Sequence, residues 1–241
     1  MAHSENKSKD AYIGKEYYDD SSYFDKQTSV FMDLNNPFQQ YRISNVLKIY
    51  TPQKNERVLD LGCGWGTFVF LLAPSCKEVI GLDFSSKSID LCNEFLEKDP
   101  QENIKFICAD AADTDLEAES FDLIISADLF EHIYPEDFER IIDECQRLLK
   151  PGGKLSIWTP HRGHILEILK NNNIILKRDI AHVDYKTMDG MIASLKKKGF
   201  AIKKSYYAES HVPILRTIEK LLLKFIPIFQ RRIVILAEKQ A

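Results

Sequence analysis

The chain has 241 residues, of which 44% are hydrophobic, and its formal net charge is −4 at pH 7. This length suits one α/β domain with additions and allows a complete hydrophobic core. The charge gives no general reason to expect nucleic-acid binding, and no apolar run reaches the ~20 residues that a membrane-spanning helix requires.

The first 35 residues are expected to form an N-terminal arm, followed by one domain over residues 36–241. Tyr12 to Phe31 is rich in aromatic side chains. This composition predicts either a lid over a bound ligand or a short helix that packs on the core. Apolar side chains at helical spacing then predict a helix from Gln40 to Tyr50, which ends before Pro52.

An apolar strand at residues 58–61 leads into three alternating glycines, Gly62, Gly64 and Gly66. Glycines at this spacing let the main chain turn sharply and approach a ligand closely. Asp60 lies just before them, where its carboxylate would repel a pyrophosphate group. The same carboxylate would attract the cationic sulfonium and ammonium groups of S-adenosylmethionine. The loop therefore predicts a site for this methyl donor.

Two more acids end the next two predicted strands. Asp83 lies roughly 20 residues after the first glycine, the spacing at which a carboxylate meets ribose hydroxyls in a βαβ nucleotide unit. Asp110 ends a strand that begins at Ile104, and its carboxylate can accept a hydrogen bond from an amine such as adenine N6. Ligands of open α/β sheets bind outside the carboxyl ends of the strands, so these acids are expected to converge with Asp60 on one crevice.

Strands and helices alternate from residue 58 onwards, which predicts a parallel sheet with right-handed crossovers. Helices are expected at 67–73, 86–96, 135–149 and 189–198, with Ser85 or Ser86 as the N-cap of the second. The remaining strands are expected near 121–127 and at 154–159, 200–207 and 232–237.

Residues 211–230 form an expected helical insertion between the last two strands. The segment has a strongly apolar face together with the basic residues Arg216, Lys220 and Lys224. A basic amphipathic helix can lie on an anionic membrane surface as a peripheral contact. Burial against the domain or in a homodimer is commoner, so packing or dimerisation is favoured over membrane contact.

From Arg57 to about Gly153 the chain resembles the class I S-adenosylmethionine-dependent methyltransferases of the small-molecule type. Residues 58–66 resemble the first motif of that family, Glu131 and His132 its Glu-His pair after the fourth strand, and residues 148–155 its turn into the fifth strand. The resemblance implies a doubly wound α/β fold, with a mostly parallel seven-stranded sheet and an antiparallel last strand, the Rossmann-like methyltransferase fold. It implies S-adenosyl-L-methionine as cofactor. The cofactor-binding residues are expected to be Asp60, Gly62, Cys63, Gly64, Gly66, Asp83, Phe84, Asp110, Ala111 and Asp128.

His132 is the first candidate for a general base, which is needed only if the acceptor must lose a proton. An ordinary histidine pKa near 6.5 suits proton removal at neutral pH, and His132 follows the fourth strand, where it would face the methyl group. The alternative is a structural histidine that hydrogen-bonds a loop. His161, at the end of the fifth strand, ranks second, and His164 and His182 could also line the pocket.

Some related quinone-pathway O-methyltransferases recruit a divalent metal near a similar Glu-His pair. In this sequence Glu131, His132 and Glu136 are too few to predict a metal site, and none is expected.

Together these features predict a methyltransferase that acts on an oxygen or nitrogen of a small-molecule, sugar or lipid-linked acceptor. No Asn-Pro-Pro-Tyr-like segment follows the fourth strand, and no cysteine stands where a covalent base methylase needs its nucleophile, so a nucleic-acid acceptor is not expected. The alternative is a noncatalytic S-adenosylmethionine-binding regulatory or partner module. Five cysteines without close pairing and polar residues 1–10 without a signal-peptide pattern favour a reducing, cytoplasmic location.

Overall fold

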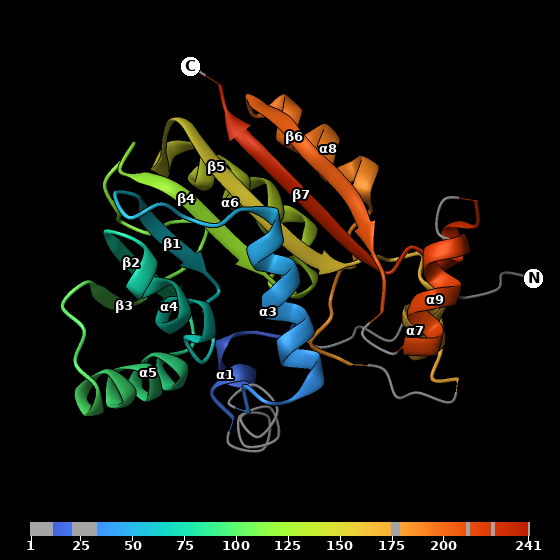
Figure 1. The fold of residues 1–241 in the computed structure, drawn as a ribbon, viewed down its shortest axis with the longest axis horizontal. Helices are drawn as coiled ribbons and strands as arrows, with labels where there is room; N and C mark the ends of the chain where they lie inside the picture. The colour runs from blue at the N-terminus through green and yellow to red at the C-terminus, as the bar shows by residue number, and fades with distance from the viewer. Residues whose placement is uncertain (1–11, 21–32, 175–178, 211–212, 223–224, 241) are drawn as a thin grey trace, which may run out of the picture.

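The computed structural model describes residues 12–20, 33–174, 179–210, 213–222 and 225–240. Its strands form one seven-stranded sheet in the order β3-β2-β1-β4-β5-β7-β6 (Figure 1). β7 runs antiparallel to both β5 and β6, whereas the pairs among β1 to β5 are parallel. The predicted fold class is therefore confirmed. The strands are β1 (Arg57–Leu61), β2 (Glu78–Asp83), β3 (Ile104–Cys108), β4 (Phe121–Ala127), β5 (Leu149–Pro160), β6 (Phe200–Ala208) and β7 (Arg232–Lys239).

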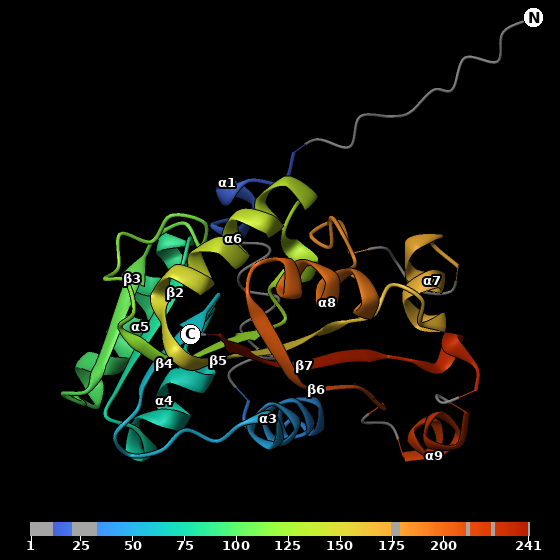
Figure 2. The ribbon, with the colours of Figure 1, turned by 90° about the horizontal axis from the view of Figure 1, so that it is seen from above.

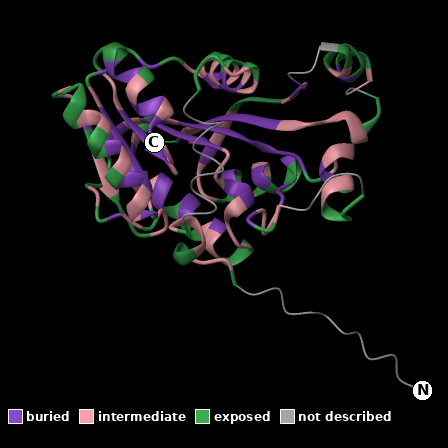
Figure 3. Ribbon diagram, turned by 90° about the horizontal axis from the view of Figure 1, so that it is seen from below, coloured by how far each residue is buried: buried purple, intermediate pink, exposed green. Residues whose placement is uncertain are grey.

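Helices cover both faces of the sheet. Successive strand residues point to opposite faces, so Val58 packs with one helical layer and Leu59 with the other. The first layer consists of α3 (Pro37–Ile49), α4 (Thr67–Leu72) and α5 (Ser86–Lys98), and the second of α6 (Pro135–Leu148) and α8 (Met188–Lys197). Figure 2 shows α6 and α8 across the sheet from α3 and α4, and Figure 3 shows the buried residues concentrated between these layers.

Several boundaries differ from those expected. The fifth strand begins at Leu149 rather than at residue 154, because Leu149 already pairs with Phe121 on β4. Ser85 is the N-cap of α5, where its hydroxyl accepts the backbone N–H of Ser88. Helix α7 (Ile165–Asn171) has no counterpart in the expectations, and the arm contains the short helix α1 (Lys15–Tyr18).

The expected helical insertion at 211–230 is not one continuous helix. Helix α9 (Pro213–Leu222) ends before residues 223–224, which lie outside the described part of the chain, and a 3-10 turn follows at Pro227–Phe229. Proline disfavours helical backbone in the residue before it, and Ile226 is extended, with φ −127° and ψ 101°. Among the described helices, none is long and apolar enough to cross a membrane.

Candidate functional site

A cavity of about 680 Å³ lies at the carboxyl ends of the parallel strands. Its wall is built from the segments that follow β1, β2, β3 and β4, together with α1 of the arm. This volume is in the range of small-molecule sites. The site residues predicted from sequence that line it are Gly62, Cys63, Gly64, Asp83, Phe84, Asp110, Ala111, Asp128 and His132.

The loop after β1 depends on glycine for its shape. Gly62 has a φ of +76°, and a Cβ at this position would lie 2.9 Å from Cδ1 of Leu129. Gly66 also has a positive φ, but it is not part of the cavity wall. It is the N-cap of α4, and a Cβ there would meet Phe70 and Cys92 at 3.0 and 3.1 Å. Gly62 thus keeps the loop close to the segment after β4, whereas Gly66 allows α4 and α5 to pack closely.

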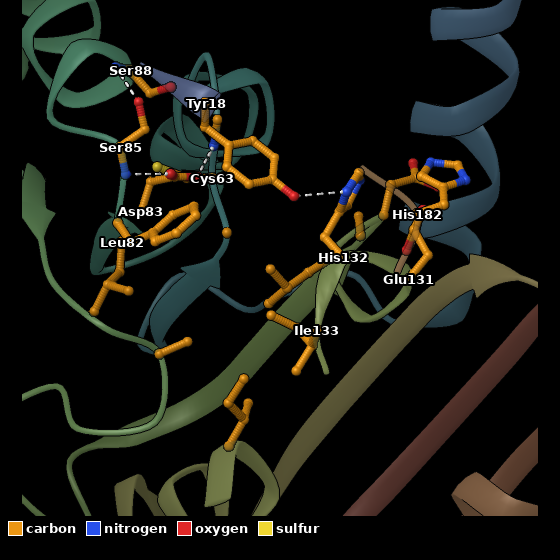
Figure 4. Close-up of a pocket in the computed structure, with 18 of the residues that line it drawn as sticks. Tyr18, Cys63, Leu82, Asp83, Ser85, Ser88, Glu131, His132, Ile133 and His182 are labelled. Atoms are coloured by element: carbon orange, nitrogen blue, oxygen red, sulfur yellow. Dashed lines mark hydrogen bonds between the residues drawn. The ribbon is translucent and has the colours of Figure 1, made fainter. Parts of the chain in front are cut away.

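Asp83 is held by backbone groups on both sides (Figure 4). Its Oδ2 accepts the N–H of Gly64 and its Oδ1 accepts the N–H of Ser85, each at 2.9 Å. Burial raises the pKa of Asp83, and these backbone donors oppose that shift. Each carboxylate oxygen keeps further acceptor capacity. The carboxylate is therefore oriented to accept two hydroxyl groups.

The segment after β3 places Asp110 on the cavity wall. Its Oδ1 accepts the backbone N–H of Ala112 at 2.8 Å, which fixes the carboxylate within the turn. The ring of Phe84 lies edge-on to the ring of Tyr18 from α1, with 5.1 Å between centroids. The arm and the segment after β2 therefore meet at this cavity.

Asp60 is buried, and it is not among the residues that line the cavity. Within the described structure, its Oδ2 has no hydrogen-bond partner. Burial raises the pKa of Asp60 to about 7, against the opposing charge of Arg42. An unpaired buried carboxylate oxygen is costly, so a cationic ligand near this loop would stabilise it.

Asp128 lies between two arginines that the sequence did not single out. Its Oδ2 is 2.7 Å from Nε of Arg42 on α3, and its Oδ1 is 2.6 Å from Nη1 of Arg232 at the start of β7. Burial alone would raise the pKa of Asp128, but the two guanidinium groups lower it below its ordinary value. Asp128 has a φ of +59°, which is uncommon for a residue with a side chain. All three residues line the cavity.

His132 is half-buried at the end of the cavity that lies after β4. Its Nδ1 is 2.9 Å from the carbonyl oxygen of Ala181 and 3.2 Å from the hydroxyl of Tyr18. A carbonyl oxygen only accepts, so the proton must be on Nδ1, which leaves Nε2 as a hydrogen-bond acceptor. Burial lowers the pKa of His132. The ring is thus neutral near pH 7, in a state that can accept a proton.

A second histidine lies next to His132. The rings of His132 and His182 are 4.9 Å apart, edge to face. Nδ1 of His182 is 2.6 Å from the hydroxyl of Tyr185, which donates to Oε2 of Glu167 at 2.9 Å. Because that hydroxyl proton is used, Nδ1 of His182 must donate to the Tyr185 oxygen. Burial, followed by the charge of His132, lowers the pKa of His182 to about 4.

Glu131, His132 and His182 could together hold a metal ion. Each offers one ligand atom, and these atoms lie within 4.8 Å of one another. Thr159 donates to Oε2 of Glu131 at 2.9 Å, and burial, followed by the charge of Asp128, raises the pKa of Glu131 to about 8. Glu136, considered as a third ligand from the sequence, is not in this group.

His161, the second candidate for a base, is not on the cavity wall. Its Nδ1 is 2.9 Å from the carbonyl oxygen of Gln230, and its ring packs on Tyr207. His164 is fully buried, with its Nε2 3.2 Å from Oε1 of Glu219. Of the three histidines considered after the fifth strand, the cavity contains only His182.

Comparison with known proteins identifies related sequences. Residues 58–153 match a family model described as a methyltransferase domain. The ubiquinone biosynthesis O-methyltransferase of Coxiella burnetii is 38% identical over 109 residues, 45% of each chain. Phosphoethanolamine N-methyltransferase 1 of Triticum aestivum is 37% identical over 114 residues, 46% of this chain and 23% of that protein. The demethylmenaquinone methyltransferase of Clavibacter sepedonicus is 33% identical over 138 residues, 57% of this chain and 53% of that protein. The chain thus spans about half the length of these curated relatives, or less.

Solved structures share the fold at low sequence identity. Phosphoethanolamine N-methyltransferase 2 of Haemonchus contortus, solved with S-adenosyl-L-methionine, has a TM-score of 0.69 and 19% identity, and the match covers 96% of this chain and 61% of that chain. The YcgJ protein of Bacillus subtilis has a TM-score of 0.65 and 18% identity, with coverage of 84% and 99%.

Proposed function

Because residues 58–153 match a family model of methyltransferase domains, we propose that this chain is a class I, S-adenosylmethionine-dependent enzyme that methylates an oxygen or nitrogen of a small-molecule acceptor. One observation carries the proposal. A single cavity combines the glycine loop, Asp83 and Asp110 with a neutral, half-buried histidine, His132. The first group suits a nucleoside-containing cofactor, and the histidine suits an acceptor that must lose a proton.

The residues on the cavity wall fit S-adenosylmethionine. Asp83 would accept the two ribose hydroxyls, Asp110 and Ala111 would contact the adenine, and the main chain at Gly62 and Gly64 would lie against the cofactor. S-adenosylmethionine carries no phosphate group, so the acids around the glycine loop would not repel it. When bound, this cofactor supplies a methyl carbon activated by a sulfonium leaving group.

His132 would receive the proton that the acceptor loses. Its Nδ1–H is held by the carbonyl of Ala181, so the ring is oriented and Nε2 remains the basic atom. Tyr12, Ile13, Lys15 and Tyr18 of the arm also line the cavity. The arm would exclude water and help to align the acceptor, in agreement with the predicted lid.

A small acceptor is supported by the size of the cavity and by the names of the relatives. Those names include an O-methyltransferase of ubiquinone biosynthesis and an N-methyltransferase of phosphoethanolamine, so both acceptor atoms occur among similar proteins. A sugar or lipid-linked acceptor fits the same chemistry, since His132 can take a proton from a hydroxyl or an ammonium group. We also propose a cytoplasmic location, supported by five free cysteines, of which four are buried.

Calorimetric titration with S-adenosylmethionine and with NAD tests the cofactor. We expect binding of the methyl donor alone, and Asp83→Ala should weaken it by about 2 to 4 kcal/mol through the loss of two charge-assisted hydrogen bonds. Asp90→Ala, which removes an exposed acid on α5, is the matched control and should bind normally. Tight NAD binding without a response to the methyl donor would refute the proposal.

Formation of S-adenosylhomocysteine tests catalysis separately. The protein is incubated with the methyl donor and with panels of phenols, amines, sugars and lipid extracts. Product that depends on an acceptor supports an enzyme. Binding of the donor without product in any panel would instead favour a noncatalytic regulatory or partner module.

A further inference from the structure

One face of α9 and the turn after it present large apolar side chains to solvent. Ile214, Ile218 and Leu221 have exposed fractions of 78%, 41% and 68%, and their spacing places them on one side of the helix. Phe225 and Ile226 are 80% and 40% exposed. No other stretch of similar length in the described residues exposes as many large apolar side chains. We call these five residues the α9 patch.

A buried hydrogen bond anchors α9 to the protein through a different side of the helix. Glu219 and His164 are both fully buried, with Oε1 of Glu219 3.2 Å from Nε2 of His164. The other oxygen of Glu219 accepts the backbone N–H of Ser210. Separating buried polar groups from their hydrogen-bond partners is unfavourable. The anchor therefore resists rotation of α9 and keeps the α9 patch directed outward.

The charge beside the α9 patch is positive. Arg216 and Lys220 are exposed, whereas Glu219, the sole acid of α9, is buried. Lys224 follows directly in the sequence. This local positive charge occurs in a chain whose formal net charge is −4. The surface of α9 is thus both apolar and basic, unlike the chain as a whole.

The apolar face and the positive charge of α9 together distinguish between two partners that could cover the α9 patch, a second copy of the chain and a lipid membrane. A two-fold contact between copies brings the same surface of each copy together, so Arg216 and Lys220 would approach their own counterparts without an acid of α9 to compensate. An anionic lipid surface has the opposite charge, and its acyl boundary accepts apolar side chains. The α9 surface therefore complements an anionic membrane better than it complements the α9 surface of a second copy.

We propose that the α9 patch is the docking surface by which this protein binds peripherally to an anionic membrane. The five apolar side chains enter the boundary between headgroups and acyl chains, and Arg216 and Lys220 pair with lipid phosphates. At the margin of the molecule α9 can make this contact without rearrangement of the sheet (Figure 1). The docking does not depend on methyl transfer.

Sedimentation of the full chain with lipid vesicles tests the proposal. Binding is expected to vesicles of phosphatidylcholine with phosphatidylserine, to be weaker without phosphatidylserine, and to fall as salt rises. The double variant Ile214→Glu and Leu221→Glu should reduce binding by roughly tenfold or more. Arg216→Gln and Lys220→Gln should each reduce it by about fivefold.

The matched control is the double variant Leu34→Glu and Leu71→Glu, which makes the same chemical change at exposed positions outside the α9 patch. It should bind vesicles like the unmodified protein, and all variants should bind S-adenosylmethionine equally, which verifies folding. Vesicle binding that is absent, or is unaffected by the α9 variants, overturns the proposal. So does a dimer in sedimentation equilibrium that the Ile214→Glu and Leu221→Glu variant disrupts while vesicles remain unbound, because a second copy then covers the patch.

Discussion

The hydroxyl of Tyr18 lies 3.2 Å from Nδ1 of His132, although 114 positions separate the two residues in the chain. Tyr18 belongs to α1 of the arm, and His132 ends the 3-10 turn that follows β4. The same nitrogen contacts the carbonyl of Ala181. Three distant segments therefore meet at one imidazole ring, and the arm forms part of the surroundings of the candidate base.

Tyr18→Phe should lower kcat/KM by about fivefold, because one hydrogen bond contributes about 1 kcal/mol. The Phe ring keeps the contacts with Phe84 and His132, so S-adenosylmethionine affinity should change little. Steady-state kinetics and calorimetry measure the two effects. Tyr206→Phe, on β6 and outside the cavity wall, is the control. Equal kinetic losses in both variants would contradict the expected role of Tyr18.

Removal of residues 1–31 should leave the fold intact, abolish turnover and weaken cofactor binding. The physical reason is that the described part of this arm supplies four residues to the cavity wall; residues 21–32 lie outside the described structure. Thermal unfolding, turnover and calorimetry separate the three effects. A truncated protein that turns over its acceptor normally would show that the arm is not a lid.

His132→Ala should lower the rate by roughly 10²- to 10⁴-fold if His132 is the general base. His161→Gln serves as the comparison, because His161 lies outside the cavity wall and should affect turnover far less. Rates are measured across neutral pH for both variants. Full activity of His132→Ala at every pH would mean that the acceptor needs no base or uses another one.

Tyr185→Phe should release His182 from its fixed tautomer. The lost hydroxyl connects Nδ1 of His182 to Glu167. Nitrogen NMR of the imidazole should show one tautomer in the unmodified protein and a mixture in the variant, and turnover should fall by about tenfold. A variant with an unchanged tautomer signal would contradict this positioning role, whatever its activity.

Asp60 should make stability depend on pH. Its pKa is raised by burial from 3.8 to about 7 in the folded protein, so at intermediate pH the folded state holds a proton that the unfolded state has lost. This stabilising contribution is complete below the unfolded pKa and is lost as pH rises through about 7. Relative to the unmodified protein, Asp60→Asn should gain on the order of 2 kcal/mol of unfolding free energy between about pH 5 and pH 8. Denaturant titrations of both proteins at each of these two pH values measure the gain. A difference in unfolding free energy that is the same at both pH values would show that Asp60 does not titrate in this range.

Local patterns were enough to predict the sheet and several residues that share one cavity at its edge. Gly62 and Gly64 follow β1, Asp83 ends β2 and Asp110 follows β3, and these residues line one cavity as expected, whereas Asp60 does not. Parallel strands carry such residues to the same edge of the sheet whatever the details of packing. Strand, turn and acid are close neighbours in the chain, so their spacing carries the necessary information.

The surroundings of Asp128 and His182 were decided by tertiary structure. The pairing of Arg232 with Asp128 depends on β7 lying beside β5 in the register that sets Arg232 opposite Pro160. That arrangement joins residues far apart in the chain, so no spacing in the sequence marks it. His161 ranked above His182 as a candidate, yet of the two only His182 reaches the cavity. Which side chain lines the cavity depends on how distant segments pack, because contacts between them leave no periodic pattern in either segment.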